Sequence, residues 1–262
     1  MRRVAAAPVA LALAAWMAGC GGGAVADRAG GPVLSLEQEI AVGRAAAPYL
    51  EVLAGGRLDD LAVQAYVRTV GERVARSTPM PELPYQFIVT QSPETAVFAL
   101  PGGPVVVTRG LLAALRTEAQ LAAALAHPLA RINTRQVVGA LQRELGKADL
   151  LTAAAAGEAA CAGRLSDRQA ETLARFAAAV SQLKADPEAD GEADRLGLDY
   201  MVAAGYNPRG MTGFLETVAP ADEDGGRAGR IGRAIDRKYG DRGGRVADEE
   251  YRREVLDRLK DR

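Results

Sequence analysis

Apolar and polar residues follow a helical period in the first structured part of the chain. Ser35, with Gln38 three positions later, is typical of a capping box and predicts a helix that ends near residue 53. The glycine pair at 55–56 interrupts that helix. A second helix is predicted over residues 58–76, because its apolar residues share one helical face: Leu61, Ala62, Tyr66, Val70 and Val74.

The pattern changes after a loop marked by three prolines between residues 79 and 84. Residues 85–90 are rich in β-branched and aromatic side chains and predict a strand. Two further short strands are predicted at 97–100 and 105–108, on either side of a Pro-Gly-Gly turn. This part of the chain therefore predicts a small sheet.

Helical patterns return after the third strand. Gly110 begins a short helix, and Thr117 with Gln120 caps a longer one that contains His127. Alanine-rich helical segments extend to about Lys184, and a short helix is predicted over residues 192–204. With few aromatic residues and abundant alanine, the chain is expected to be mostly helical.

The C-terminal segment, residues 219–262, has a different composition. It is rich in Arg, Asp, Glu and Gly and has few core-forming residues before a charged helix predicted over 248–259. We interpret it as a solvated tail with a terminal helix rather than a second domain. The predicted domain is residues 35–218.

Length and charge restrict the classes of function. The 262 residues suffice for one large or two small domains. The formal net charge of −1 argues against nucleic acid as a partner, because binding of phosphate backbones needs a basic excess.

The N-terminal residues have the features of a secretory signal. Two arginines precede an apolar run, too short to span a membrane, that ends in Met-Ala-Gly-Cys at Cys20. This ending resembles the lipobox of bacterial lipoproteins, whose cysteine is acylated; a plain secreted protein is the alternative. The interpretation gives a signal peptide at 1–19, a lipidated Cys20, and a flexible tether over 20–34. No Asp follows Cys20, so the outer membrane is the expected location.

Several segments, in this order and spacing, resemble the zinc metalloprotease family of the CaaX prenyl protease and the HtpX-type proteases. They are Phe-Ala-Leu-Pro-Gly-Gly at 98–103 and the residues at 37–43, 66–67, 107–112, 118–122, 192–197 and 204–208. The similarity is to the periplasmic and lipoprotein branch of that family. It implies an α+β, mostly helical zincin-like (gluzincin) domain with a small sheet beside the active-site helix.

The resemblance also implies a set of catalytic residues, most of which are replaced. The family motif His-Glu-x-x-His places two zinc-binding imidazoles on one helix face and a general base between them. Here the first ligand is His127, the general-base position holds Pro128, and the second ligand position holds Arg131. Asp190 stands at the position of the third ligand, a glutamate in the family, and Asp194 retains the carboxylate that orients a ligand histidine.

These replacements argue against zinc chemistry. His127 and Asp190 alone lack the third protein ligand of a catalytic zinc site, and His127 is the only histidine in the chain. Arg131 adds a positive charge that repels a dication. Pro128 cannot accept a proton, and it should kink or restart its helix at a cost of about 3 kcal/mol. We therefore expect no zinc and no other cofactor.

Arg131 suggests a substitute for the metal. Its guanidinium could occupy the zinc position and pair bidentately with Asp190 or Asp194, bridging the two helices that zinc would join. The alternative is that Arg131 reaches solvent from an emptied cleft.

The strand at residues 105–107 has two interpretations. Val105, Val106 and Val107 could form an edge strand that pairs with the backbone of a bound peptide, as in active family members. An ordinary buried strand is the alternative.

Three functions remain. The first is a pseudoprotease of the bacterial cell envelope that binds envelope proteins or unfolded peptides, attached to the membrane by its N-terminal lipid. The second is an active zinc metalloendopeptidase with an atypical metal site. The third is a structural lipoprotein with a collapsed cleft. We favour the first, because an active enzyme would need substitutes both for the general base missing at Pro128 and for the metal ligand missing at Arg131.

Overall fold

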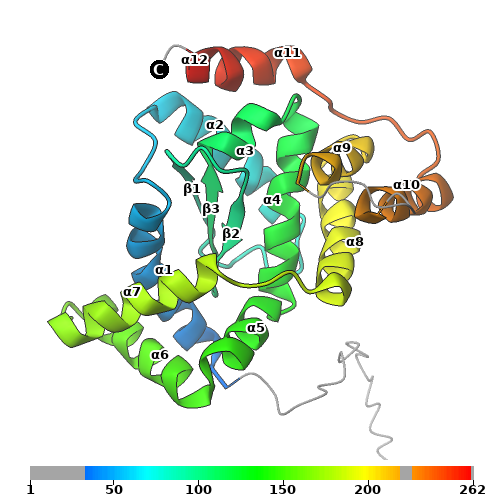
Figure 1. Ribbon diagram of the computed structural model, residues 1–262. Helices are drawn as coiled ribbons and strands as arrows, with labels where there is room; N and C mark the ends of the chain where they lie inside the picture. Colours follow the sequence, from blue (N-terminus) through cyan, green and yellow to red (C-terminus); the bar gives the residue numbers. More distant parts are fainter. Residues whose placement is uncertain (1–32, 219–225, 261–262) are drawn as a thin grey trace, which may run out of the picture. The chain divides into compact units, whose positions relative to one another are not determined.

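The computed structural model of the protein describes residues 33–218 and 226–260 (Figure 1). The elements are α1 (Leu36–Leu53), α2 (Leu61–Ala75), β1 (Gln86–Thr90), β2 (Val97–Ala99), β3 (Pro104–Thr108), α3 (Arg109–Ala114), α4 (Glu118–Asn133), α5 (Gln136–Leu145), α6 (Lys147–Cys161), α7 (Asp167–Ser181), α8 (Pro187–Ala203), α9 (Arg209–Val218), α10 (Gly226–Lys238), α11 (Asp248–Tyr251), the π-helical turn η1 (Arg252–Leu256) and α12 (Asp257–Lys260). The fold is α+β and mostly helical with a small sheet, which confirms the predicted class. The predicted signal peptide and Cys20 lie outside the described residues. Leu34, the last residue of the predicted flexible tether, is instead buried in the core.

The start of each early helix is set by a local side-chain cap. At Ser35 the predicted capping box forms: the hydroxyl accepts a bond from the Gln38 backbone, and the Gln38 side chain accepts one from Ser35 N. The second helix begins at Leu61 rather than at Leu58, because the Asp60 carboxylate caps the first backbone N–H groups of α2. Leu58 instead donates its N–H to the end of β1.

The sheet has the strand order β1-β3-β2, with β1 parallel and β2 antiparallel to β3. Every residue of β3 is buried, and the strand is paired along both sides. The expectation that Val105, Val106 and Val107 form a peptide-binding edge strand is therefore wrong. They form the centre of the sheet, the alternative considered above, because neighbouring strands already use their backbone groups on both sides.

Helix α4 packs against α2, α8 and α9 (Figure 1). Its residues are buried along most of its length. The helix continues as a single α-helix through Pro128 to Asn133, so the expected restart at Pro128 is wrong. Proline removes one backbone bond from the helix interior. Contacts on several sides hold the helix together at this point, because tertiary packing outweighs local propensity.

The alanine-rich helix α6 packs closely on α1. Its Gly157 lies so near the backbone of Val42 that an added Cβ would be 2.6 Å from the Val42 Cα. Small side chains thus permit the close approach of the two helices.

The C-terminal segment is not the solvated tail expected from its composition. Its apolar residues Ile231, Ile235, Tyr251 and Val255 are buried, and the Tyr251 hydroxyl donates a 2.7 Å bond to the Leu112 carbonyl. The predicted terminal helix is present as α11, η1 and α12, which are continuous in sequence. Within residues 33–218 and 226–260, no helix has the length and apolar character needed to cross a membrane.

Candidate functional site

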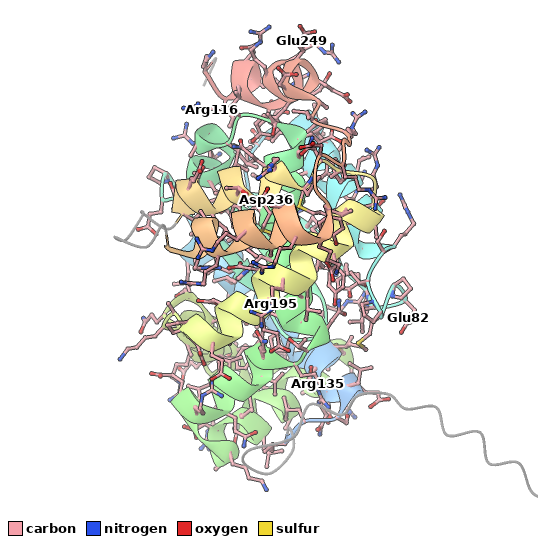
Figure 2. The ribbon with its side chains drawn as sticks, turned by 90° about the vertical axis from the view of Figure 1, so that its right-hand side faces the viewer. Glu82, Arg116, Arg135, Arg195, Asp236 and Glu249 are labelled. Atoms are coloured by element: carbon pink, nitrogen blue, oxygen red, sulfur yellow. The ribbon has the colours of Figure 1, made fainter. Side chains whose placement is uncertain are left out.

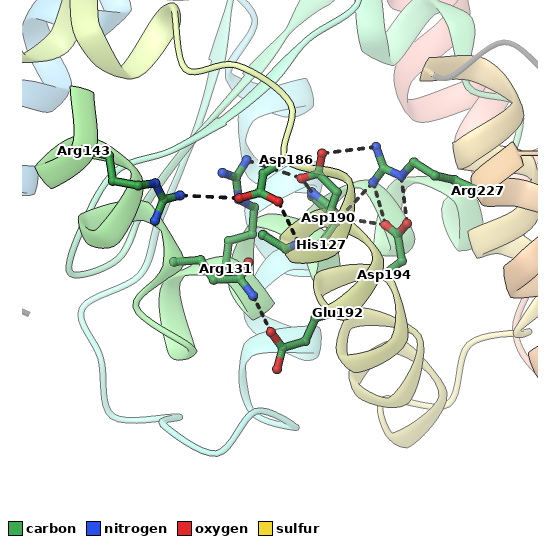
Figure 3. A network of polar contacts seen from close by, with 10 residues as sticks. His127, Arg131, Arg143, Asp186, Asp190, Glu192, Asp194 and Arg227 are labelled. Carbon is green, nitrogen blue, oxygen red and sulfur yellow. Dashed lines mark hydrogen bonds and ion pairs between the residues drawn. The ribbon is translucent and has the colours of Figure 1, made fainter. Parts of the chain in front are cut away.

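Two helices, α4 and α8, carry the residues that the family resemblance singles out (Figure 3). The helices come close at Gly197 of α8, where an added Cβ would lie 3.1 Å from the backbone carbonyl carbon of Ala126. Helix α8 starts at Pro187, after Asp186 caps the backbone N–H of Ala189. In the helix that follows, Asp190 and Asp194 lie on the face of α8 that meets α4.

His127 lies between two buried carboxylates of α8. Its Nδ1 is 2.9 Å from Asp194 Oδ1, and its Nε2 is 3.8 Å from Asp190 Oδ1. An ionised carboxylate only accepts hydrogen bonds, so the proton of this bond is on His127 Nδ1. The imidazole is thereby fixed in the orientation that the retained Asp194 predicts.

A third helix supplies a cation to this pair. Arg227 of α10 donates two hydrogen bonds to Asp194, from Nε to Oδ2 at 2.8 Å and from Nη2 to Oδ1 at 2.7 Å (Figure 3). Its Nη1 also lies 3.9 Å from Asp190 Oδ2. The two-pronged contact with Asp194 is the strong form of an arginine–carboxylate pair.

The contacts determine the charge of Asp194. Burial alone would raise the pKa of its carboxyl, since the Asp194 side chain is only 1% exposed. The hydrogen bonds from His127 and Arg227 outweigh burial and bring the pKa below its ordinary value of 3.8. Asp194 is therefore a carboxylate at neutral pH, with its charge balanced by Arg227.

Arg131 makes a weaker contact than the bidentate pair proposed above. Its Nη1 lies 3.8 Å from Asp190 Oδ1, and its buried Nε has no hydrogen-bond partner in the part of the chain that the structure describes. Among the described residues, the bidentate guanidinium at this site belongs to Arg227 and not to Arg131. The predicted bidentate contact of Arg131 between α4 and α8 is therefore not formed. A different arginine, Arg227, makes such a contact, and it joins α10 to α8.

A cleft lies beside Arg131. It has a volume of about 230 Å³ and lies between α5 and the first turns of α8. At its wall, Gln136 donates a 2.8 Å bond to Glu192. Arg143 and Asp186 form an exposed ion pair nearby at 3.4 Å. The cleft thus has a polar wall of mixed charge.

The donor set does not fit a catalytic zinc ion. Among residues 33–218 and 226–260, no group of three His, Cys, Asp or Glu side chains is placed to hold a metal. A catalytic zinc site needs three protein ligands and an open position for water. Here the Arg227 guanidinium lies on the carboxylates and places a positive charge where a metal would need ligands. Pro128 offers no base beside it.

A second buried network anchors the segment that follows α10. Glu118, the first residue of α4, accepts bonds from Tyr66 at 2.5 Å, Tyr206 at 2.8 Å and Arg245 Nε at 2.6 Å. The Arg245 backbone also accepts a bond from Asn207 N. The C-terminal segment is thereby fastened to the helix that carries His127.

The sequence analysis did not identify Arg227 as a site residue, because it lies in the segment interpreted as a solvated tail. One signal was available. Ile231 and Ile235 are four residues apart among arginines, which is the spacing of a helix with one buried face. That spacing predicts a packed amphipathic helix, although it does not indicate where the helix docks.

Comparisons with known proteins place the chain among metallopeptidases. The family model described as "Peptidase family M48" matches residues 61–251. The "Beta-barrel assembly-enhancing protease" of Yersinia pestis is 28% identical over 208 residues, which cover 72% of this chain and 39% of the relative. The protein of the same name from Escherichia coli K12 is 27% identical over 190 residues, covering 71% and 38%. The matched part thus spans well under half the length of these relatives.

Proposed function

The chain belongs to peptidase family M48, and we propose that it is a non-catalytic member of the bacterial cell envelope that binds unfolded or incompletely assembled proteins. A shared fold does not by itself imply a shared reaction, so the proposal rests on the residues of the site.

The observation that carries the proposal is the contact between Arg227 and Asp194. Arg227 of α10 donates bonds of 2.8 and 2.7 Å to Asp194, so a guanidinium lies beside His127 and Asp190, the two positions that the resemblance leaves for metal ligands. The general-base position is Pro128, which has no proton acceptor. Loss of both the metal and the base removes the activated water that peptide hydrolysis requires.

The location and the binding role rest on other support. The signal-like N-terminus and the lipobox at Cys20 favour a lipoprotein that faces the periplasm, with the outer membrane as the proposed site. The names of the relatives state that they enhance assembly of β-barrels, and a protein of related fold could assist the same clients without cutting them.

Zinc content and proteolysis test the proposal directly. Purified full-length protein should carry well below one zinc per chain and leave casein intact, with and without a chelator. The Escherichia coli relative, prepared and assayed in parallel, serves as the positive control. Stoichiometric zinc together with chelator-sensitive cleavage would overturn the proposal and establish the alternative, an active endopeptidase with an atypical site.

The binding role needs a second assay. We expect the protein to slow the aggregation of a chemically denatured β-barrel protein diluted into buffer, at stoichiometric and not catalytic amounts. The matched control is the same assay with a denatured helical protein of the periplasm. No effect on either client would argue against a binding role.

A structural role is the second candidate. It is favoured by the same Arg227 contact, because the guanidinium fills the centre of the site from a third helix. In that case the protein would bind no zinc and cleave no casein, and it would also leave the aggregation of both clients unchanged.

A further inference from the structure

A cavity lined by arginines lies between α8 and α10, on the side of α10 away from the C-terminal helices. Figure 2 views this face, with α10 in front and Arg195 on α8. The cavity has a volume of about 230 Å³. Its charged lining residues are Asp194 and the arginines at 195, 227, 230, 233 and 237.

Among the described residues, most of these arginines have no carboxylate partner. Arg227 is committed to Asp194 at the inner end of the cavity. The side chains of Arg195, Arg230, Arg233 and Arg237 are exposed, and among the described residues none of them forms an ion pair. The groove therefore gathers several positive charges that this part of the chain does not balance.

Nearby carboxylates are paired elsewhere. Asp236 of α10 accepts a 2.6 Å bond from Arg209, and Asp199 of α8 accepts bonds of 2.7 Å from Lys238. Among the described residues, Asp194 is therefore the one acid that lines the arginine groove, and it is bound to Arg227. Like charges held together in this way lower the stability of the fold unless an anion joins them.

From this arrangement we propose that the groove between α8 and α10 binds a multiply charged phosphate anion, either a free phosphate compound or a phosphomonoester headgroup. Arginine matches phosphate well, because its planar fork donates two parallel hydrogen bonds to two oxygens. A single carboxylate carries one charge and two oxygens, whereas a phosphomonoester or a pyrophosphate carries two or more charges and accepts bonds from several guanidinium groups at once. The lining of four unpaired arginines favours the polyvalent anion.

The cavity also has the size for such a ligand. Besides the charged side chains and Gly191, the lining residues are Ile231 and Ala234. One water needs about 10–15 Å³ of such a cavity, so a volume of about 230 Å³ holds a phosphate group with several waters. The proposal does not depend on whether the M48 site is catalytic.

The test measures binding of sodium pyrophosphate and of inorganic phosphate to the full-length protein by calorimetry, against sodium chloride at equal ionic strength. Arg230→Gln combined with Arg233→Gln should weaken pyrophosphate binding by about tenfold or more, since each charged hydrogen bond contributes strongly. The matched control is Arg164→Gln with Arg168→Gln. These two exposed arginines near the start of α7 form no ion pair among the described residues and lie outside the cavity. They should leave binding unchanged.

The outcomes separate the possibilities. No binding of pyrophosphate, or equal weakening by both double variants, would overturn the proposal. Tighter binding of polyglutamate than of pyrophosphate would also overturn it, in favour of an acidic peptide. If phosphatidylcholine vesicles bind the protein only when they contain phosphatidic acid, and pyrophosphate releases them, the ligand is a headgroup. If pyrophosphate binds and such vesicles do not, it is a soluble phosphate compound.

Discussion

Replacement of Arg227 by alanine tests whether a guanidinium holds α10 on α8. The change removes two hydrogen bonds to Asp194 and leaves that buried carboxylate with His127 as its remaining partner. Breaking a fully buried ion pair costs about 3–5 kcal/mol. Arg227 retains 22% of its side-chain exposure, so solvent screens part of the interaction, and we expect the free energy of unfolding to fall by about 2–3 kcal/mol. For a domain of this size, that loss lowers Tm by about 4–12 °C.

Thermal unfolding followed by circular dichroism measures the effect. Arg230→Ala is the matched control, because it removes an arginine from the same helix that is exposed and has no ion pair among the described residues. Its Tm should change little, since exposed substitutions of this kind are worth within about 0.5 kcal/mol. Equal melting temperatures for Arg227→Ala and Arg230→Ala would refute the reasoning.

Three further predictions concern buried contacts elsewhere in the fold. Tyr251→Phe removes the buried bond to the Leu112 carbonyl and should cost about 1–3 kcal/mol in urea unfolding; unchanged stability would show that this bond does not hold α11. Gly157→Ala should destabilise by about 1–3 kcal/mol despite the helix propensity of alanine, because the new Cβ meets the Val42 backbone; a rise in Tm would contradict this. Burial alone would raise the pKa of Glu118, but its guanidinium and phenol donors bring it below the ordinary 4.5. Glu118→Gln should therefore cost stability at neutral pH, and the difference from wild type should shrink as the pH falls below 4.5 in a series of melts; a constant difference would count against it.

Much of the fold was predictable, because its signals are local. The Ser35 capping box and the strand that begins near residue 85 are set by residues within a few positions of one another. The start of the second helix was misplaced, since Leu58 has the apolar character of the helix but the cap is Asp60. The continuity of α4 through Pro128 depends on contacts from three other helices, which no local pattern contains.

The site was predictable only in part. The spacing of Asp190 and Asp194 places both on one face of a helix, and the structure brings them to His127. The order of the strands was not encoded in the apolar run at Val105, which fits a central strand as well as an edge. Arg227 lies 33 residues from Asp194 in a segment dominated by charge, and its partner becomes clear only when α10 is docked.

The crossing at Gly197 has a consequence for how such a protein can change over time. Because the backbones of α4 and α8 lie so close there, the packing of the two helices depends on the missing side chain of Gly197. Architecture and chemistry are thus carried by different residues in this chain. A substitution at His127 or Asp190 would change the chemistry of the site, whereas a larger residue at Gly197 would push the two helices apart.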